Sequence, residues 1–239
     1  MSEASPITKR PVLAHELQVA DPPTVTVTWS DHSIQIRSRD RVRDLAEVYT
    51  HDREVNAMLD LLPDMFPTAG DRGGIDRTFL EPACGHGNFL VEIMRRKLTY
   101  VTTSRYGRGE DFEYRVLRCL TSIYGIDISE DNVIEACQRI RSALEMHLDG
   151  IKVTKGFTEA VGVILSTNIQ RADTLTDARR VELIAYKPVG NGTFVREWSY
   201  LEEQELDLFS EPALRRDDEP VHYSNLIGHP APVARISGS

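Results

Sequence analysis

The sequence predicts an α/β fold built on a doubly wound, mostly parallel sheet. Short apolar and β-branched segments alternate with longer segments of helical periodicity, a pattern typical of parallel strands joined by helices. A glycine turn joins the first of these strands to the next helix, and 239 residues are enough for one sizeable core. The predicted parallel strands cover residues 78–81, 123–128, 168–172 and 181–186.

The N-terminal part of the chain is predicted to precede the main domain. Residues 1–22 are polar and have no sustained period, which favours a mobile arm. Residues 24–29 and 33–37 alternate in polarity, so we expect a small β-hairpin there. The predicted order is an arm with a hairpin, a main domain and a partly disordered C-terminal extension, over residues 1–37, 38–190 and 191–239.

The main domain is expected to begin with a helix over residues 51–62, because apolar residues recur there along one side. Thr50 is the expected N-cap, and Pro63 is expected to stop the helix. A polar loop that contains proline and glycine then leads to the first parallel strand.

The first parallel strand ends in a turn with the sequence E-P-A-C-G-H-G at residues 81–87. Gly85 and Gly87 allow the backbone to turn tightly and bring a ligand against main-chain N–H groups where the next helix begins. A dinucleotide-binding fingerprint is the weaker interpretation, because Leu90 replaces its third glycine and Glu81 would repel a pyrophosphate. A turn without any ligand is the plain alternative.

This turn resembles motif I of the class I S-adenosylmethionine (SAM) methyltransferases, in particular the DNA methyltransferases that act on adenine N6. The resemblance implies a Rossmann-like SAM-dependent methyltransferase fold. It implies that Gly85 and Gly87 hold the amino-acid part of SAM, that Phe89 packs beside the cofactor, and that Glu81 orients the turn. The remaining residues of the turn that we assign to the cofactor site are Pro82, Ala83, Cys84 and Asn88.

The residues before the first helix resemble motif X of the same family. Tyr49 and Thr50 match its aromatic and threonine positions, and they are implied to cover the carboxylate end of SAM. Ala46 and His51 replace the glycine and proline of the usual pattern. A capped amphipathic helix without a ligand is the alternative.

Asp127 lies at the end of the predicted strand 123–128. In the resembled family, an acid at this position accepts the two ribose hydroxyls of SAM, and a carboxylate can accept two such hydrogen bonds at once. Ile128 would then lie against the adenine ring. The alternative is that Asp127 caps the next helix, but Ser129 is already placed to fill that role.

Two further helices are predicted over residues 130–148 and 156–165, and the strand 168–172 follows them. Asp173 comes directly after this strand and resembles the acid of motif III. The resemblance implies that Asp173 meets the amino group of the cofactor's adenine.

The catalytic residue is unknown at the level of the sequence. In the resembled family, the carboxyl end of the next strand carries Asn/Asp-Pro-Pro-Tyr/Phe, whereas this chain has Tyr186-Lys187-Pro188-Val189 after the strand 181–186. The group that accepts a hydrogen bond from the target amine is therefore missing, as is the ring that stacks on the flipped base. Residues 191–239 are expected to be too short for a target-recognition domain.

The composition argues against a chain that binds DNA unaided, because the net charge is −9 and phosphate binding depends on Lys and Arg. No apolar run is long enough to cross a membrane and no signal region is present, so we expect a cytoplasmic protein. Cys84, Cys119 and Cys137 lack metal-ligand spacing, so no metal site is expected.

Three functions are consistent with these expectations. The first two are an adenine-N6 DNA methyltransferase of the restriction-modification type and the SAM-binding subunit of a split one. The subunit would reach DNA in a complex with a second protein chain that carries catalysis and target recognition. The third is a SAM-dependent enzyme for a small molecule or protein. A non-catalytic, regulatory SAM-binding protein is a further alternative.

Overall fold

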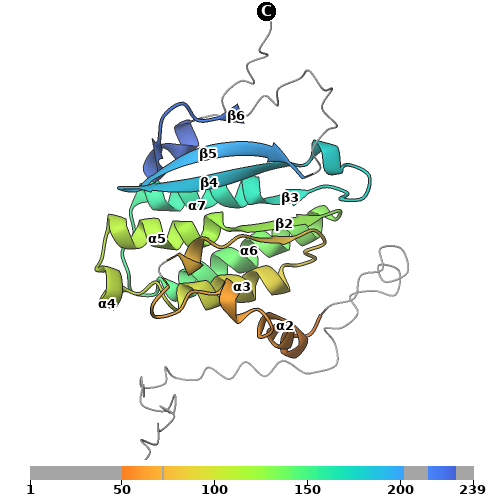
Figure 1. Ribbon diagram of the computed structural model, residues 1–239, viewed down its shortest axis with the longest axis horizontal. Coiled ribbons are helices and arrows are strands. Elements are labelled where there is room, and N and C mark those ends of the chain that lie inside the picture. The colour runs from red at the N-terminus through yellow and green to blue at the C-terminus, as the bar shows by residue number, and fades with distance from the viewer. Residues whose placement is uncertain (1–49, 72, 202–214, 230–239) are drawn as a thin grey trace, which may run out of the picture.

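The computed structural model describes residues 50–71, 73–201 and 215–229 (Figure 1). The predicted arm, the predicted hairpin, Tyr49 and residues 202–214 and 230–239 of the predicted C-terminal extension lie outside these residues. The described helices are α2 (Asp52–Leu59), α3 (Asn88–Leu98), α4 (Thr103–Tyr106), α5 (Glu110–Thr121), α6 (Glu130–His147) and α7 (Lys155–Asn168). Short 3-10 helices are η1 (Pro63–Met65), η2 (Gly74–Asp76), η3 (Ala178–Arg180) and η4 (Tyr223–Gly228).

A three-stranded parallel sheet lies at the centre of the α/β fold. It has the order β1 (Phe79–Glu81), β2 (Ile123–Asp127) and β3 (Ile169–Arg171). Leu80 pairs with Tyr124, and Ile126 pairs with Gln170. All five residues of β2 are buried, as expected for a central strand. The sequence therefore predicted these three parallel strands correctly.

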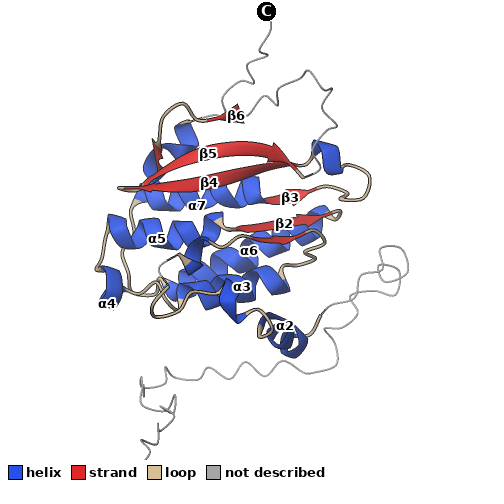
Figure 2. Cartoon of the chain, viewed as in Figure 1, coloured by secondary structure: helices blue, strands red, loops and turns tan. Residues whose placement is uncertain are grey.

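Helices α3 and α6 pack together and both contact β2 (Figure 2). Gly125 of β2 makes room for α3, because a Cβ atom at this position would lie 2.5 Å from Cδ1 of Leu90 and 3.1 Å from Sγ of Cys84. This close packing seats the turn at residues 81–87 directly against the middle strand. Helices α5 and α7 precede β2 and β3 in the chain and pack against each other.

The predicted fourth parallel strand is wrong. The residues concerned belong to β4 (Glu182–Gly190), which pairs antiparallel with β5 (Thr193–Tyr200) in a separate sheet. The reason is the two-residue turn between these strands, in which Asn191 and Gly192 have φ angles of 49° and 74°. Positive φ at both positions matches the type I′ turn that favours tight hairpins, for which Asn-Gly is the preferred sequence.

The second sheet is completed by short strands near the C-terminal end of the described chain. Strands β6 (Arg215–Arg216) and β7 (Val221–His222) both pair antiparallel with β5. Two side chains join the sheets, since Tyr124 Oη donates to the Ile184 carbonyl at 2.8 Å and Gln170 Nε2 donates to the Glu182 carbonyl at 2.7 Å.

Helix α2 begins one residue later and ends earlier than the sequence predicts. Its N-cap is His51, whose Nδ1 accepts a hydrogen bond from the Arg53 N–H, so the predicted Thr50 cap is wrong. The helix ends at Leu59, and Pro63 begins η1. The helix boundary moves because the His51 side chain can accept the same exposed N–H group as a threonine hydroxyl.

Candidate functional site

The glycine turn and the acid at the end of β2 lie in direct contact. The Gly85 N–H donates a 2.8 Å hydrogen bond to Oδ2 of Asp127, although 42 positions separate the two residues. Both glycines of the turn have positive φ, 52° at Gly85 and 85° at Gly87, a backbone region that favours glycine. The parallel pairing of β1 with β2 places these two strand ends side by side.

The two glycines face different surroundings. A Cβ atom at Gly85 would have no heavy atom within 4 Å, so this side of the turn is open. A Cβ atom at Gly87 would lie 2.9 Å from the Cβ of Ala136, so Gly87 allows α3 to begin against α6. The Gly85 side of the turn is therefore open, whereas close packing on α6 explains Gly87.

The Asp127 carboxylate accepts three hydrogen bonds from residues that the structure describes. Besides the bond from Gly85, its Oδ1 accepts from the Ser129 N–H at 2.8 Å and from Asn132 Nδ2 at 3.1 Å. Asp127 is 8% exposed. The expectation that Ser129 caps α6 is only half correct, because Ser129 occupies the cap position but its side chain makes no capping bond.

Asp127 thus supports the start of α6, which is the alternative role that the sequence left open. A carboxylate offers about four lone-pair sites, so one is left beyond the three bonds described. Sequence reasoning missed Asn132. Its position in the first turn of α6, from which a side chain can reach back over the helix start, was the available signal.

Asn88 connects the site to the N-terminal side of the domain. Its side-chain amide donates a 2.7 Å hydrogen bond to the Thr50 carbonyl, so Thr50 lies beside the first residue of α3. This contact brings two of the predicted site residues together across 38 positions of the chain. Tyr49, the neighbouring prediction, lies outside the described residues.

Two ionisable groups of the turn are partly removed from water. Burial raises the pKa of the Glu81 carboxyl, and a weak hydrogen bond from the Ala83 N–H opposes the shift. Burial, together with the negative charges of Asp127 and Glu81, raises the pKa of the Cys84 thiol to about 12. Cys84 is therefore a neutral thiol near neutral pH and is not an activated nucleophile.

Asp173 lies in the loop after β3 and is tied to that loop. Its Oδ1 accepts a 2.9 Å hydrogen bond from the Leu175 N–H, which is the main cause of its lowered pKa. The loop reaches the glycine turn through Thr174, whose hydroxyl donates to the Pro82 carbonyl at 3.3 Å. Ile128 is 50% exposed, whereas Phe89 is partly buried against the core.

Residues 186–189, which stand where the resembled family has its catalytic motif, do not join this site. Strand β4 starts beside Gln170, passes Tyr124 near the beginning of β2, and ends at Gly190, whose N–H donates to Tyr114 Oη on α5. It therefore runs away from the carboxyl ends of β1 and β2. Tyr186 is buried, and its hydroxyl lies 3.0 Å from that of Thr167.

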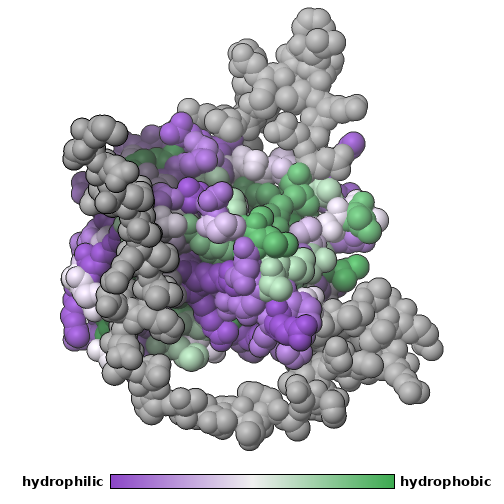
Figure 3. Space-filling view, turned by 60° about the horizontal axis from the view of Figure 1, so that its bottom comes forward, coloured by the Kyte–Doolittle hydropathy of each residue, from purple (hydrophilic) through white to green (hydrophobic). Residues whose placement is uncertain are grey.

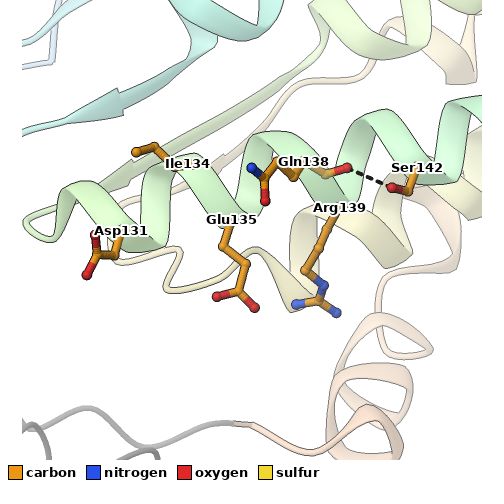
Figure 4. A pocket seen from close by; sticks show the side chains of 6 residues that line it. All are labelled: Asp131, Ile134, Glu135, Gln138, Arg139 and Ser142. Atoms are coloured by element: carbon orange, nitrogen blue, oxygen red, sulfur yellow. Dashed lines mark hydrogen bonds between the residues drawn. The ribbon is translucent and has the colours of Figure 1, made fainter.

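Two of the cavities that the described residues form have volumes of about 540 Å³ each, and neither of these two is lined by Gly85 or Asp127. The first lies along the outer side of α6, where side chains project from one side of the helix (Figure 4). Arg139 from this row donates to the His86 carbonyl at 2.9 Å and so braces the glycine turn. The second lies between α5 and the β4–β5 turn.

Within residues 50–71, 73–201 and 215–229, no three His, Cys, Asp or Glu side chains gather in a way that could hold a metal ion. In the same residues, no helix combines the length and the apolar character that crossing a membrane requires. Comparison of the chain with protein-family models, curated proteins and solved structures finds no match.

Proposed function

We propose that this chain binds SAM at the carboxyl ends of β1 and β2 in a Rossmann-like methyltransferase domain. The observation that carries the proposal is the contact between Gly85 and Asp127, with open space on the Gly85 side of the turn. Ligands of open α/β sheets bind at this end of the strands. The three-stranded parallel sheet and the helices around it are compatible with such a domain.

Each residue of the site would have a distinct task. The open side of Gly85 and the first N–H groups of α3 would receive the carboxylate of the amino-acid part, because a helix N-terminus attracts negative charge. Asp127 would use its one remaining acceptor site for a ribose hydroxyl, and the half-exposed Ile128 would cover the adenine ring. Bound SAM supplies an electrophilic methyl group.

We further propose that the methyl acceptor is adenine in DNA and that a second protein chain completes the active site. Tyr186 is buried in β4, and this strand runs away from Gly85, so the residues in the place of the catalytic motif cannot reach the methyl group. The net charge of −9 also suits a protein whose DNA contacts come from a basic partner. Such a system would operate in the cytoplasm, as part of restriction-modification.

The acidic composition is also compatible with other SAM-binding functions. A SAM-dependent enzyme for a small molecule or a protein needs no phosphate-binding surface, so a net charge of −9 is no obstacle to it. A regulatory SAM-binding protein would share the cofactor site. Methyl transfer to duplex DNA separates these functions from the proposed one.

Calorimetric titration of the purified chain with SAM tests the cofactor site. Asp127→Ala should weaken binding by about 1.5–3 kcal/mol, the scale for losing hydrogen bonds to a charged acceptor. Asp149→Ala is the matched control, because Asp149 is exposed just beyond the end of α6. Asp127 also holds the turn, so Asp127→Ala alone does not separate ligand binding from support of the turn. Ile128→Ala removes apolar contact but no hydrogen bond, and it should weaken SAM binding as well. Unchanged affinity in both variants would reject the site.

Transfer of labelled methyl groups from SAM to duplex DNA tests whether a second protein chain is needed for DNA methylation. The chain alone should give little or no product, and addition of the protein encoded by the adjacent gene should restore transfer to adenine. Robust methylation by this chain alone would overturn the split arrangement. SAM binding without any DNA methylation in the mixture would favour the small-molecule, protein or regulatory functions.

A further inference from the structure

Strand β1 has one paired edge and one open edge within the described residues. It pairs with β2 alone, and the Phe79 N–H donates to the Ser122 carbonyl at 2.9 Å. Backbone groups of a strand alternate in direction, so Phe79 and Glu81 face β2 while the N–H and C=O of Leu80 face the opposite edge. This edge could accept a further strand.

The side chains beside this edge are also uncovered. Leu80 is 40% exposed, and Thr78, on the same side of the strand, is exposed. Three exposed apolar residues lie in or just after the parallel strands: Leu80, Ile128 and Leu175. Figure 3 shows apolar side chains gathered in one part of the visible surface, between strongly polar regions. An open edge beside an exposed leucine is a surface that proteins usually protect from other chains.

We propose that residues 24–29 of the same chain add to the open edge of β1 as a fourth strand of the parallel-sheet layer. Their sequence is Thr-Val-Thr-Val-Thr-Trp, which alternates and has no charged side chain. Val25, Val27 and Trp29 would share one face of the new strand and pack beside Leu80, while the threonines face the other side. Residues 33–37 fit the edge less well, because this shorter segment ends in Arg37.

The chain is long enough to make this connection. The hydrogen bond from Asn88 to the Thr50 carbonyl places Thr50 at the start of α3, close in sequence and space to the end of β1. Residues 30–49 link the proposed strand to Thr50 and span up to about 66 Å when extended. Residues 24–29 belong to the same chain as β1, so their effective concentration at the open edge is high. This favours them over a strand from a second copy of the chain. The proposal is independent of SAM binding.

Amide hydrogen exchange of the full-length chain, followed residue by residue by NMR, is the first test. The Leu80 amide should exchange at least ~100-fold more slowly than an unprotected amide, and Val25→Pro combined with Thr26→Pro should abolish the protection. The Phe79 amide, which is bonded to Ser122, is the internal control and should stay protected in both proteins. An unprotected Leu80 amide beside a protected Phe79 amide would overturn the proposal.

Engineered disulfides identify the occupant of the edge. Leu80→Cys combined with Val25→Cys or Val27→Cys should give a disulfide within one monomer in at least one pair, because facing residues of paired strands lie within disulfide range. Leu80→Cys with Thr26→Cys is the matched control, since Thr26 projects to the opposite face. Equal cross-linking of all pairs, or disulfide-linked dimers of the Leu80→Cys variant alone, would contradict the proposal.

Discussion

The hydroxyl of Tyr223 donates a 2.7 Å hydrogen bond to Oε2 of Glu113 across 110 positions of the chain. Glu113 is buried in α5, and the same carboxylate accepts from the N–H and the hydroxyl of Thr154 at the start of α7. Two segments distant in the sequence therefore converge on one buried carboxylate of α5. Helix η4, which begins at Tyr223, packs closely on α7. This arrangement fastens the C-terminal part of the described chain to the α/β core.

Tyr223→Phe should lower the free energy of unfolding by about 1.5–3 kcal/mol, the range for a hydrogen bond to a charged group. The phenylalanine ring still fills the site of the tyrosine ring, so the decrease in unfolding free energy reports the loss of the hydroxyl group alone. Urea unfolding of the two proteins measures the difference. Tyr200→Phe is the matched control and should change stability little, because Tyr200 is 44% exposed. Equal stability of wild type and Tyr223→Phe would show that water replaces the hydroxyl at no cost.

Two glycine-to-alanine substitutions should have opposite effects on stability. Gly192 has a φ of 74° in the β4–β5 turn, and a Cβ atom there would lie 2.4 Å from Nε2 of His222. Gly192→Ala should destabilise the protein by about 1–3 kcal/mol. Gly162 lies within α7 with free space around it, so Gly162→Ala should stabilise by about 0.5–1 kcal/mol. Thermal unfolding shows whether each variant is more or less stable than the wild type. Unchanged stability of Gly192→Ala would contradict the turn assignment.

The buried thiols predict a loss of stability at alkaline pH. Burial raises the pKa of Cys119 from 9.0 to about 12, so this thiol keeps its proton in the folded state. The unfolded chain releases that proton near pH 9, and the unfolded state therefore binds fewer protons between pH 9 and 12. Stability must fall as the pH rises through this window, by up to ~1.4 kcal/mol per pH unit for one thiol.

Cys119→Ala removes this contribution. We expect its unfolding free energy to fall less steeply above pH 9 than that of the wild type, whatever the offset between the two proteins at pH 7. Chemical unfolding at intervals from pH 7 to 10.5 measures both slopes. Parallel curves would mean that the Cys119 thiol titrates alike in the folded and unfolded chains.

Periodicity in the sequence was sufficient to locate the longer helices and the three parallel strands, whereas the short helix α4 was missed. The apolar spacing after Asn88 predicts α3, and the short buried segment that ends at Asp127 predicts β2. Such patterns persist in the folded chain because each element must bury one face, whatever its neighbours are. The glycine turn was predictable for a similar reason, since the backbone conformations of Gly85 and Gly87 favour residues without a side chain.

The local sequence also predicts the antiparallel direction of β4. The order expected from the methyltransferase resemblance favoured a parallel strand, whereas the Asn191-Gly192 pair favours a hairpin. The turn acts over four residues, and no distant contact is needed to reverse the chain there. This local preference leads Tyr186 away from the glycine turn.

The sequence by itself determined the three parallel strands, the longer helices, the glycine turn and the acid that ends β2. Only the tertiary structure decided what that acid contacts. Asp127 receives hydrogen bonds from Gly85, Ser129 and Asn132, and the bond from Gly85 depends on the parallel pairing of β1 and β2. Periodicity reports which side of an element is buried, because burial is a property of each residue and its near neighbours. Hydrogen bonds between distant segments depend on register and packing, which the whole fold sets.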